Sequence, residues 1–292
     1  MLSKKLTTVT LMLTATLLSL SGCSNTTTTK ANTPTTGPAI SSPATPTPIP
    51  TVPPAPVTVN TDNTNATFII NRDYPLSNNY KPSDLVVPNI PFSFSDKTLD
   101  KRKLKQVAAK ALEELYETAL AESGLKIYGV SGYRSYERQY EIYGTNLINK
   151  GTRHTNLYSA APGNSEHQTG LAIDVSCESI GFNLDNRFAS TPEGIWLKEN
   201  CWRFGFILRY PKDKEEITGY AYEPWHIRYV GVPLAYYLYN NNMTLEEYYG
   251  SPSSQSLASL EDKPLIDLTT TKFYKLYAKV KGGELMFLPL CG

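Results

Sequence analysis

The chain has 292 residues, with 28 Lys and Arg against 27 Asp and Glu, so its formal net charge is +1 at pH 7. Because proteins that bind nucleic acids present a strongly basic surface, this balance argues against a nucleic-acid partner. The length suffices for one domain with a hydrophobic core beside smaller segments. The sequence has no internal repeat and no heptad pattern, and we expect a monomer.

The first residues have the pattern of an export signal. Two lysines precede an apolar stretch over residues 6–20, which is too short for a typical membrane span. Small residues then lead to Cys23 in a sequence that resembles a bacterial lipobox. We therefore expect a signal peptide over residues 1–22, lipidation of Cys23, and an extracytoplasmic protein that is lipid-anchored to the outer face of the cell membrane. A plain cleaved secretory signal is the alternative, and it also implies export.

Composition divides the rest of the chain into three parts. Residues 23–58 are dominated by Thr, Pro, Ser, Asn and Ala, which predicts a disordered tether. Residues 59–250 carry the apolar patterns of a folded domain. The extension over residues 251–292 begins with a polar, Ser-rich stretch. It then has two apolar runs around Lys281, Gly282 and Gly283, which predict a β-hairpin.

Periodicity predicts alternating helices and short strands in the domain. Apolar residues at helical spacing predict a helix over residues 98–123, which Gly124 ends. Weaker patterns predict helices over residues 136–150, 194–204, 231–241 and 244–249, and strands over residues 127–130, 171–175, 206–209 and 226–230. Residues 151–164 are predicted to be a loop. The strand at residues 171–175 would hold Asp174 on a rigid element.

Two of the three histidines in the chain lie near carboxylates in a pattern typical of a zinc site. His167 and Asp174 are seven residues apart, which suits a loop that turns at Gly170 into a strand. A third ligand must come from elsewhere in the chain, and His226 is the best-placed candidate. Such a set leaves one tetrahedral position open for water, as in catalytic zinc sites. We therefore predict one bound zinc ion, with an ordinary His–Asp pair as the alternative.

Glu223 lies three residues before His226 and is the candidate general base. Pro224 biases Glu223 away from helical geometry. In an extended segment this odd spacing would place the two side chains on opposite faces, so we expect a turn at Pro224. Glu223 would then accept a proton from water and deliver it to the leaving amine. The alternative is a solvated acid beside a buried Trp225.

Three further side chains are candidates for binding substrate. Arg134 follows a predicted strand and is suited to binding a terminal carboxylate or to stabilising an oxyanion. Gln139 follows about one helical turn later, and Ser165 precedes His167 by two residues. Each alone is also compatible with an ordinary structural role.

The cysteines admit two interpretations. Export permits a disulfide between Cys177 and Cys201, and the alternative is two buried thiols that never meet. Cys291 has no obvious partner. The cysteines lack the close pairwise spacing of a second, structural zinc site.

Together these segments resemble the VanY-type D-alanyl-D-alanine carboxypeptidases, which are LAS (M15B) zinc metallopeptidases. The pattern S-x-H-x-x-G-x-A-x-D is met in full over residues 165–174, and residues 131–139, 205–211 and 223–231 are similar to the other signature segments. The resemblance covers about residues 127–248. It implies an α+β fold in which a small antiparallel sheet carries the zinc site and helices pack on its outer face.

The resemblance also implies a site and a substrate. His167, Asp174 and His226 would hold zinc and Glu223 would be the general acid and base, while Arg134, Gln139 and Ser165 would contact the peptide. The substrates would be peptidoglycan stem peptides, from which a D,D-carboxypeptidase removes the C-terminal D-Ala. An L,D-carboxypeptidase that acts on tetrapeptides is the nearest alternative. A non-catalytic zinc-containing wall-binding lipoprotein is another, although such a module would not need Glu223.

Overall fold

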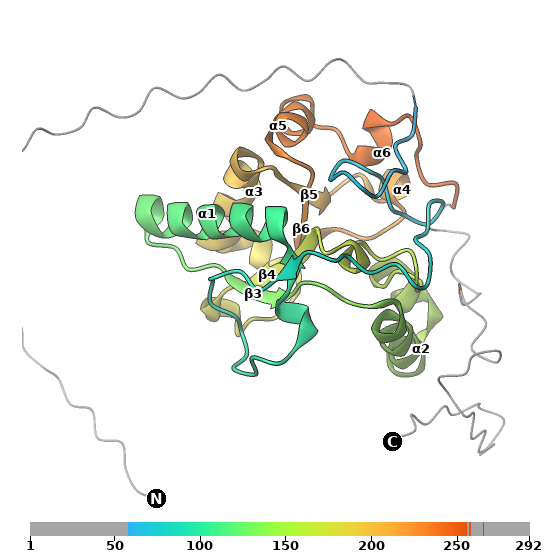
Figure 1. Cartoon of the computed structure of the whole chain (residues 1–292), viewed down its shortest axis with the longest axis horizontal. Coiled ribbons are helices and arrows are strands. Elements are labelled where there is room, and N and C mark those ends of the chain that lie inside the picture. The colour runs from blue at the N-terminus through green and yellow to red at the C-terminus, as the bar shows by residue number, and fades with distance from the viewer. Residues whose placement is uncertain (1–57, 256, 258–264, 266–292) are drawn as a thin grey trace, which may run out of the picture. The chain divides into compact units, whose positions relative to one another are not determined.

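The computed structural model describes residues 58–255, 257 and 265 (Figure 1). The predicted signal peptide, Cys23, nearly all of the tether, the predicted hairpin and Cys291 lie outside these residues and stay predictions. Within the part of the chain that is described, no helix has the length and apolar character needed to cross a membrane.

A four-stranded antiparallel sheet forms the centre of the domain, with the strand order β3-β4-β6-β5. A separate two-stranded antiparallel sheet joins β1 to β2. The strands are β1 (Leu85–Val86), β2 (Leu104–Lys105), β3 (Tyr128–Ser131), β4 (Ala172–Ser176), β5 (Phe206–Tyr210) and β6 (Glu223–Tyr229).

Helices surround this sheet. The α-helices are α1 (Gln106–Ser123), α2 (Tyr136–Tyr158), α3 (Pro192–Asn200), α4 (Glu215–Thr218), α5 (Val232–Asn241) and α6 (Leu245–Tyr248). Short 3-10 turns link them, namely η1 (Asp100–Arg102), η2 (Glu166–Thr169), η3 (Glu178–Ile180), η4 (Asn186–Ser190) and η5 (Cys201–Phe204).

Helix α1 covers one face of the sheet. Its buried residues include Leu112 and Leu115, which belong to the same apolar cluster as Ile173 of β4 and Ile227 of β6 (Figure 1). The helix ends at Gly124, whose φ of 68° is readily adopted only by glycine and whose N–H donates to the Leu120 carbonyl. Because side chains alternate along a strand, residues next to Ile173 and Ile227 face the opposite side of the sheet. The predicted α+β fold, with helices on the outer face, is confirmed.

A second apolar cluster packs α5 and α6 against β5. It joins Ile207 of β5 to Leu234 and Leu238 of α5 and to Leu245 of α6, with Ile69 from the N-terminal segment. Helix α6 begins with a capping box in which the Thr244 side chain accepts from the N–H of residue 247. This cluster therefore fixes α6 against the sheet.

Several element boundaries differ from the prediction. Residues 98–105 form η1 and β2, so the long helix begins only at Gln106. Helix α2 continues to Tyr158 through a break at Gly151, where φ is 78° and ψ is 167°, although a loop was predicted from residue 151. The predicted helix over residues 194–204 is α3, which ends at Asn200, followed by η5.

The proposed disulfide between Cys177 and Cys201 is not present. Both cysteines are free and buried in the apolar cluster that also contains α1. The Cys177 Sγ lies 3.3 Å from the Ser179 Oγ, and burial raises the pKa of the Cys201 thiol to about 12. Both cysteines lie in the same core cluster, but they are not bonded to each other. The alternative interpretation, two buried thiols, is therefore the one that describes the structure.

Candidate metal centre

Strand register places two of the predicted ligands beside each other. Asp174 of β4 and His226 of β6 are direct partners in the antiparallel ladder. His167 belongs to η2, and the chain turns at Gly170 before entering β4. Gly170 has a φ of 69°, and a Cβ there would come within 2.8 Å of Leu85 Cδ2, so this turn requires glycine.

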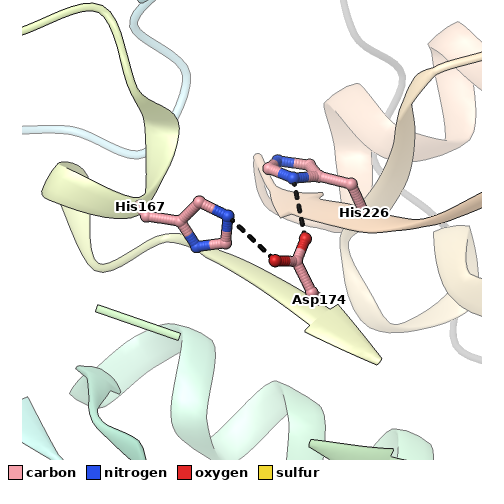
Figure 2. Close-up of side chains that lie close together, drawn as sticks. All are labelled: His167, Asp174 and His226. Atoms are coloured by element: carbon pink, nitrogen blue, oxygen red, sulfur yellow. Dashed lines mark hydrogen bonds and ion pairs between the residues drawn. The ribbon is translucent and has the colours of Figure 1, made fainter. Parts of the chain in front are cut away.

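The three side chains converge as Figure 2 shows, with the Asp174 carboxylate facing both imidazole rings. Asp174 Oδ2 lies 3.3 Å from His167 Nε2, and Asp174 Oδ1 lies 3.1 Å from His226 Nδ1. One atom from each residue can be chosen so that all three lie within 4.8 Å of one another. This spacing and these donor types suit one ion held by three protein ligands with a position left open.

Hydrogen bonding prepares His167 as a ligand. Its Nδ1 lies 2.8 Å from the Gly132 carbonyl oxygen, and a carbonyl can only accept. Nδ1 is therefore protonated and Nε2 presents its lone pair toward Asp174. Burial lowers the pKa of His167, which favours the neutral imidazole that metals bind.

The surrounding charges favour a cation at the point where these side chains meet. Burial opposes ionisation of Asp174, but the two histidines lower its pKa well below the usual range. Burial also disfavours a charged His226, yet hydrogen bonds to Asp174 and Glu166 outweigh this and raise the pKa of His226 to about 9. A positive charge is thus stabilised here, and a metal ion would supply it.

Glu223 reaches the same place through an irregularity of the sheet. Leu208 pairs with Ile227, but Tyr210 pairs with Glu223, so a step of two positions along β5 corresponds to a step of four along β6. This bulge replaces the predicted turn at Pro224 and brings Glu223 and His226 to one side, although three residues separate them in β6. Glu223 Oε2 lies 3.7 Å from His226 Nδ1, and burial raises the pKa of Glu223 to about 8.

Arg134 lies beside the cluster. Its Nη2 lies 3.9 Å from Asp174 Oδ2, and its backbone N–H donates to the His167 carbonyl. The guanidinium donates to Gln139 Oε1 at 2.7 Å and to Ser131 Oγ at 3.0 Å. These bonds aim the rest of the guanidinium at the ligand cluster.

The two further candidates for substrate binding, Gln139 and Ser165, lie in different surroundings. Gln139 is fully buried, accepts from Arg134 and donates to the Ala160 carbonyl at 2.6 Å. Its amide is therefore used within the protein, and it positions Arg134 instead of facing a ligand. Ser165 lines the cleft next to the ligands, which keeps substrate contact open to it.

Sequence reasoning missed Glu166. Its Oε2 lies 3.3 Å from His226 Nε2, and its Oε1 accepts from Arg209 and Arg228, each at 2.7 Å. Burial would raise the pKa of Glu166, but the two guanidiniums lower it well below the usual range. An acid directly before a ligand histidine was the available signal, yet its partners lie 43 to 62 residues away.

The cluster opens into a cleft of about 420 Å³. The cleft is lined by the three ligands, Arg134 and Glu223. Asn146, Lys150 and His154 of α2 and Asp185 beside η4 line it as well. The metal centre therefore opens into a cleft with both polar and apolar walls, which suits a peptide substrate.

Comparison with known proteins agrees with this geometry. The sequence model of the VanY family, described as D-alanyl-D-alanine carboxypeptidase, matches residues 101–232. Putative carboxypeptidase YodJ of Bacillus subtilis (strain 168) is 48% identical over 185 residues, which are 63% of this chain and 67% of that relative.

Two solved structures are also similar. The LdcB LD-carboxypeptidase shares 46% identity and a TM-score of 0.62, over 66% of this chain and 89% of that one. A VanY D,D-pentapeptidase from a VanB-type vancomycin resistance cassette, solved in complex with Zn(II), shares 33% identity and a TM-score of 0.52, over 63% of this chain and 98% of that one. With the family match spanning every residue of the metal centre, the chain belongs to the VanY family of D-alanyl-D-alanine carboxypeptidases.

Proposed function

We propose that this protein is a zinc-dependent carboxypeptidase that removes the C-terminal D-Ala from peptidoglycan stem peptides. The observation that carries the proposal is one cleft that combines three ligands with two further charged groups, Glu223 and Arg134. The Zn(II) found in the related VanY pentapeptidase supports zinc as the ion. A binding module would have no use for Glu223, a buried carboxylate that is neither a ligand nor within hydrogen-bond distance of one.

The chemistry divides between the ion and the protein. Zinc held by His167, Asp174 and His226 supplies Lewis acidity toward the scissile carbonyl and toward water. Glu223 accepts a proton from the attacking water on its carboxylate and later donates it to the leaving amine nitrogen. Its burial favours this exchange, because the protonated and ionised forms become closer in free energy.

Arg134 provides a fixed positive charge in the same cleft. Its guanidinium is held by Gln139 and Ser131, so little reorganisation is needed when negative charge develops on substrate oxygen. The walls formed by α2 and η4 would take the preceding residues of the stem peptide. We infer that the scissile bond is positioned by the chain terminus, which defines a carboxypeptidase.

One observation favours a second candidate within the same chemistry. Identity to the LdcB LD-carboxypeptidase is 46%, whereas identity to the VanY D,D-pentapeptidase is 33%. An L,D-carboxypeptidase would remove D-Ala from tetrapeptides with the same metal centre. The two activities differ in the residue before the scissile bond, which the cleft walls would select.

A choice of substrate separates these candidates. The protein is incubated with purified stem pentapeptide and, separately, with tetrapeptide, and products are identified by mass. Loss of one D-Ala from the pentapeptide, abolished by a chelator, supports the D,D assignment. Loss only from the tetrapeptide moves the protein to the L,D class, and no cleavage of either refutes both.

We also propose export and anchoring through a lipid on Cys23, on the basis of the N-terminal composition. The expected product is a membrane-associated form that incorporates labelled fatty acid. Replacing Cys23 with Ala should abolish the label. A labelled Cys23→Ala variant would contradict the assignment.

A further inference from the structure

His226 contacts a carboxylate through each ring nitrogen. Nδ1 faces Asp174 at 3.1 Å, whereas Nε2 faces Glu166 Oε2 at 3.3 Å on the other side. When Nε2–H donates to Glu166, the lone pair of Nδ1 is directed to the Asp174 side, where the metal would lie. Glu166 therefore fixes both the tautomer and the ring orientation of this ligand.

Two arginines hold the Glu166 carboxylate in place through its other oxygen. Its Oε1 accepts from Arg209 Nε and from Arg228 Nη1, both at 2.7 Å, and this leaves Oε2 for His226. The side chains of Glu166, Arg209 and Arg228 are fully buried. The stability of each buried charge then depends strongly on its ionic partners, because water cannot reach the charge to solvate it in their place.

The network of buried ion pairs extends through Arg209 to Glu246 of α6. Arg209 donates to both oxygens of Glu246, at 2.8 Å and 2.6 Å, and Asn71 donates to the same carboxylate at 3.1 Å. The Glu246 side chain is fully buried as well. Two carboxylates and two guanidiniums thus balance in charge, and a continuous path runs from α6 through Arg209 and Glu166 to His226.

We propose that Glu166, Arg209 and Glu246 form a positioning relay that sets the zinc affinity of the site from α6. The proposal rests on the zinc site of the proposed function. Neutralising Glu246 leaves Arg209 to interact more strongly with Glu166, and Glu166 then becomes a weaker acceptor for His226. The zinc affinity should fall although two residues, Arg209 and Glu166, separate Glu246 from the ligand and Glu246 does not line the cleft.

The test measures binding of zinc alone, by competition with a chromogenic chelator. Glu166→Gln should raise the zinc Kd about 10- to 100-fold, as is usual when the partner of a ligand histidine is altered. Glu246→Gln should raise it by a smaller factor, about 10-fold or less. Both variants should also change the visible spectrum of the Co(II)-loaded protein, which reports ligand geometry. Glu246→Asp, which keeps the charge, should partly restore the Kd.

Glu247→Gln is the matched control. Glu247 follows Glu246 on α6 but pairs with Lys214 and caps the helix, so its loss can lower stability without touching the relay. Its zinc Kd and Co(II) spectrum should equal those of the unaltered protein.

A double variant decides whether the effect passes through Glu166. In the Glu166→Gln background, Glu246→Gln should raise the Kd no further. The relay is overturned if Glu246→Gln keeps the original Kd and spectrum, or, where that variant does not fold, if Glu166→Gln keeps them. The relay would also be overturned if Glu246→Gln raised the zinc Kd by the same factor in the unaltered protein and in the Glu166→Gln variant. Zinc affinity is measured without turnover, so the relay can be tested even if the protein has no peptidase activity. If the unaltered protein did not bind zinc, both the relay and the proposed function would be refuted.

Discussion

Replacing Glu223 with Gln separates proton transfer from metal binding. Glu223 is not among the three ligands, and its nearest ion-pair distance, to His226 Nδ1, is 3.7 Å, longer than a hydrogen bond. Gln has nearly the same shape, so the ligands should stay in place. Removing a general acid and base costs about 10²- to 10⁴-fold in kcat. That range corresponds to about 2.7 to 5.4 kcal/mol of transition-state stabilisation.

The assay follows D-Ala release at saturating stem peptide, together with the zinc content of the same samples. The variant should keep one zinc per chain while kcat falls by at least about 100-fold. Glu117→Gln, on the exposed side of α1, is the control and should behave as the unaltered protein. Turnover within a factor of two of the control would refute the role of Glu223. Loss of zinc would show that Glu223 acts as a ligand.

The remaining predictions concern groups around the metal centre. Arg134→Ala should lower kcat about 10²- to 10³-fold if the guanidinium stabilises developing negative charge, and unchanged kcat and KM would make it only structural. Gln139→Ala should also lower kcat, by a smaller factor, and leave the zinc content unchanged, because it removes an acceptor of Arg134 but no ligand; a loss of zinc would show a different role. Cys201 should resist alkylation in the folded protein at pH 8, because its buried thiol has a pKa of about 12, and should react upon unfolding; prompt labelling of the native protein would contradict the burial.

The sequence sufficed to predict features that depend on neighbouring residues. The stop of α1 at Gly124 follows from glycine's access to positive φ. His167 and Asp174 occupy one short segment, and a strand at Asp174 was predicted from its apolar neighbours. The structure places them together with His226 because β4 and β6 are adjacent and in register.

Features that depend on pairing between distant segments could not be predicted from the sequence. The side on which Glu223 lies is decided by a mismatch between β5 and β6, which no local pattern encodes. Glu166 and Gln139 look like ordinary polar residues until the fold buries them against partners from other elements. The separation of Cys177 from Cys201 is likewise a property of tertiary packing.

Removing and restoring the metal tests directly whether the peptidase activity depends on zinc. The protein is stripped with a chelator, dialysed, and titrated with zinc while D-Ala release from the stem pentapeptide and bound zinc are measured together. We expect no release without metal and a linear recovery that saturates at one zinc per chain. Activity that survives complete removal of the metal, or stoichiometric zinc binding without release from pentapeptide or tetrapeptide, would contradict it.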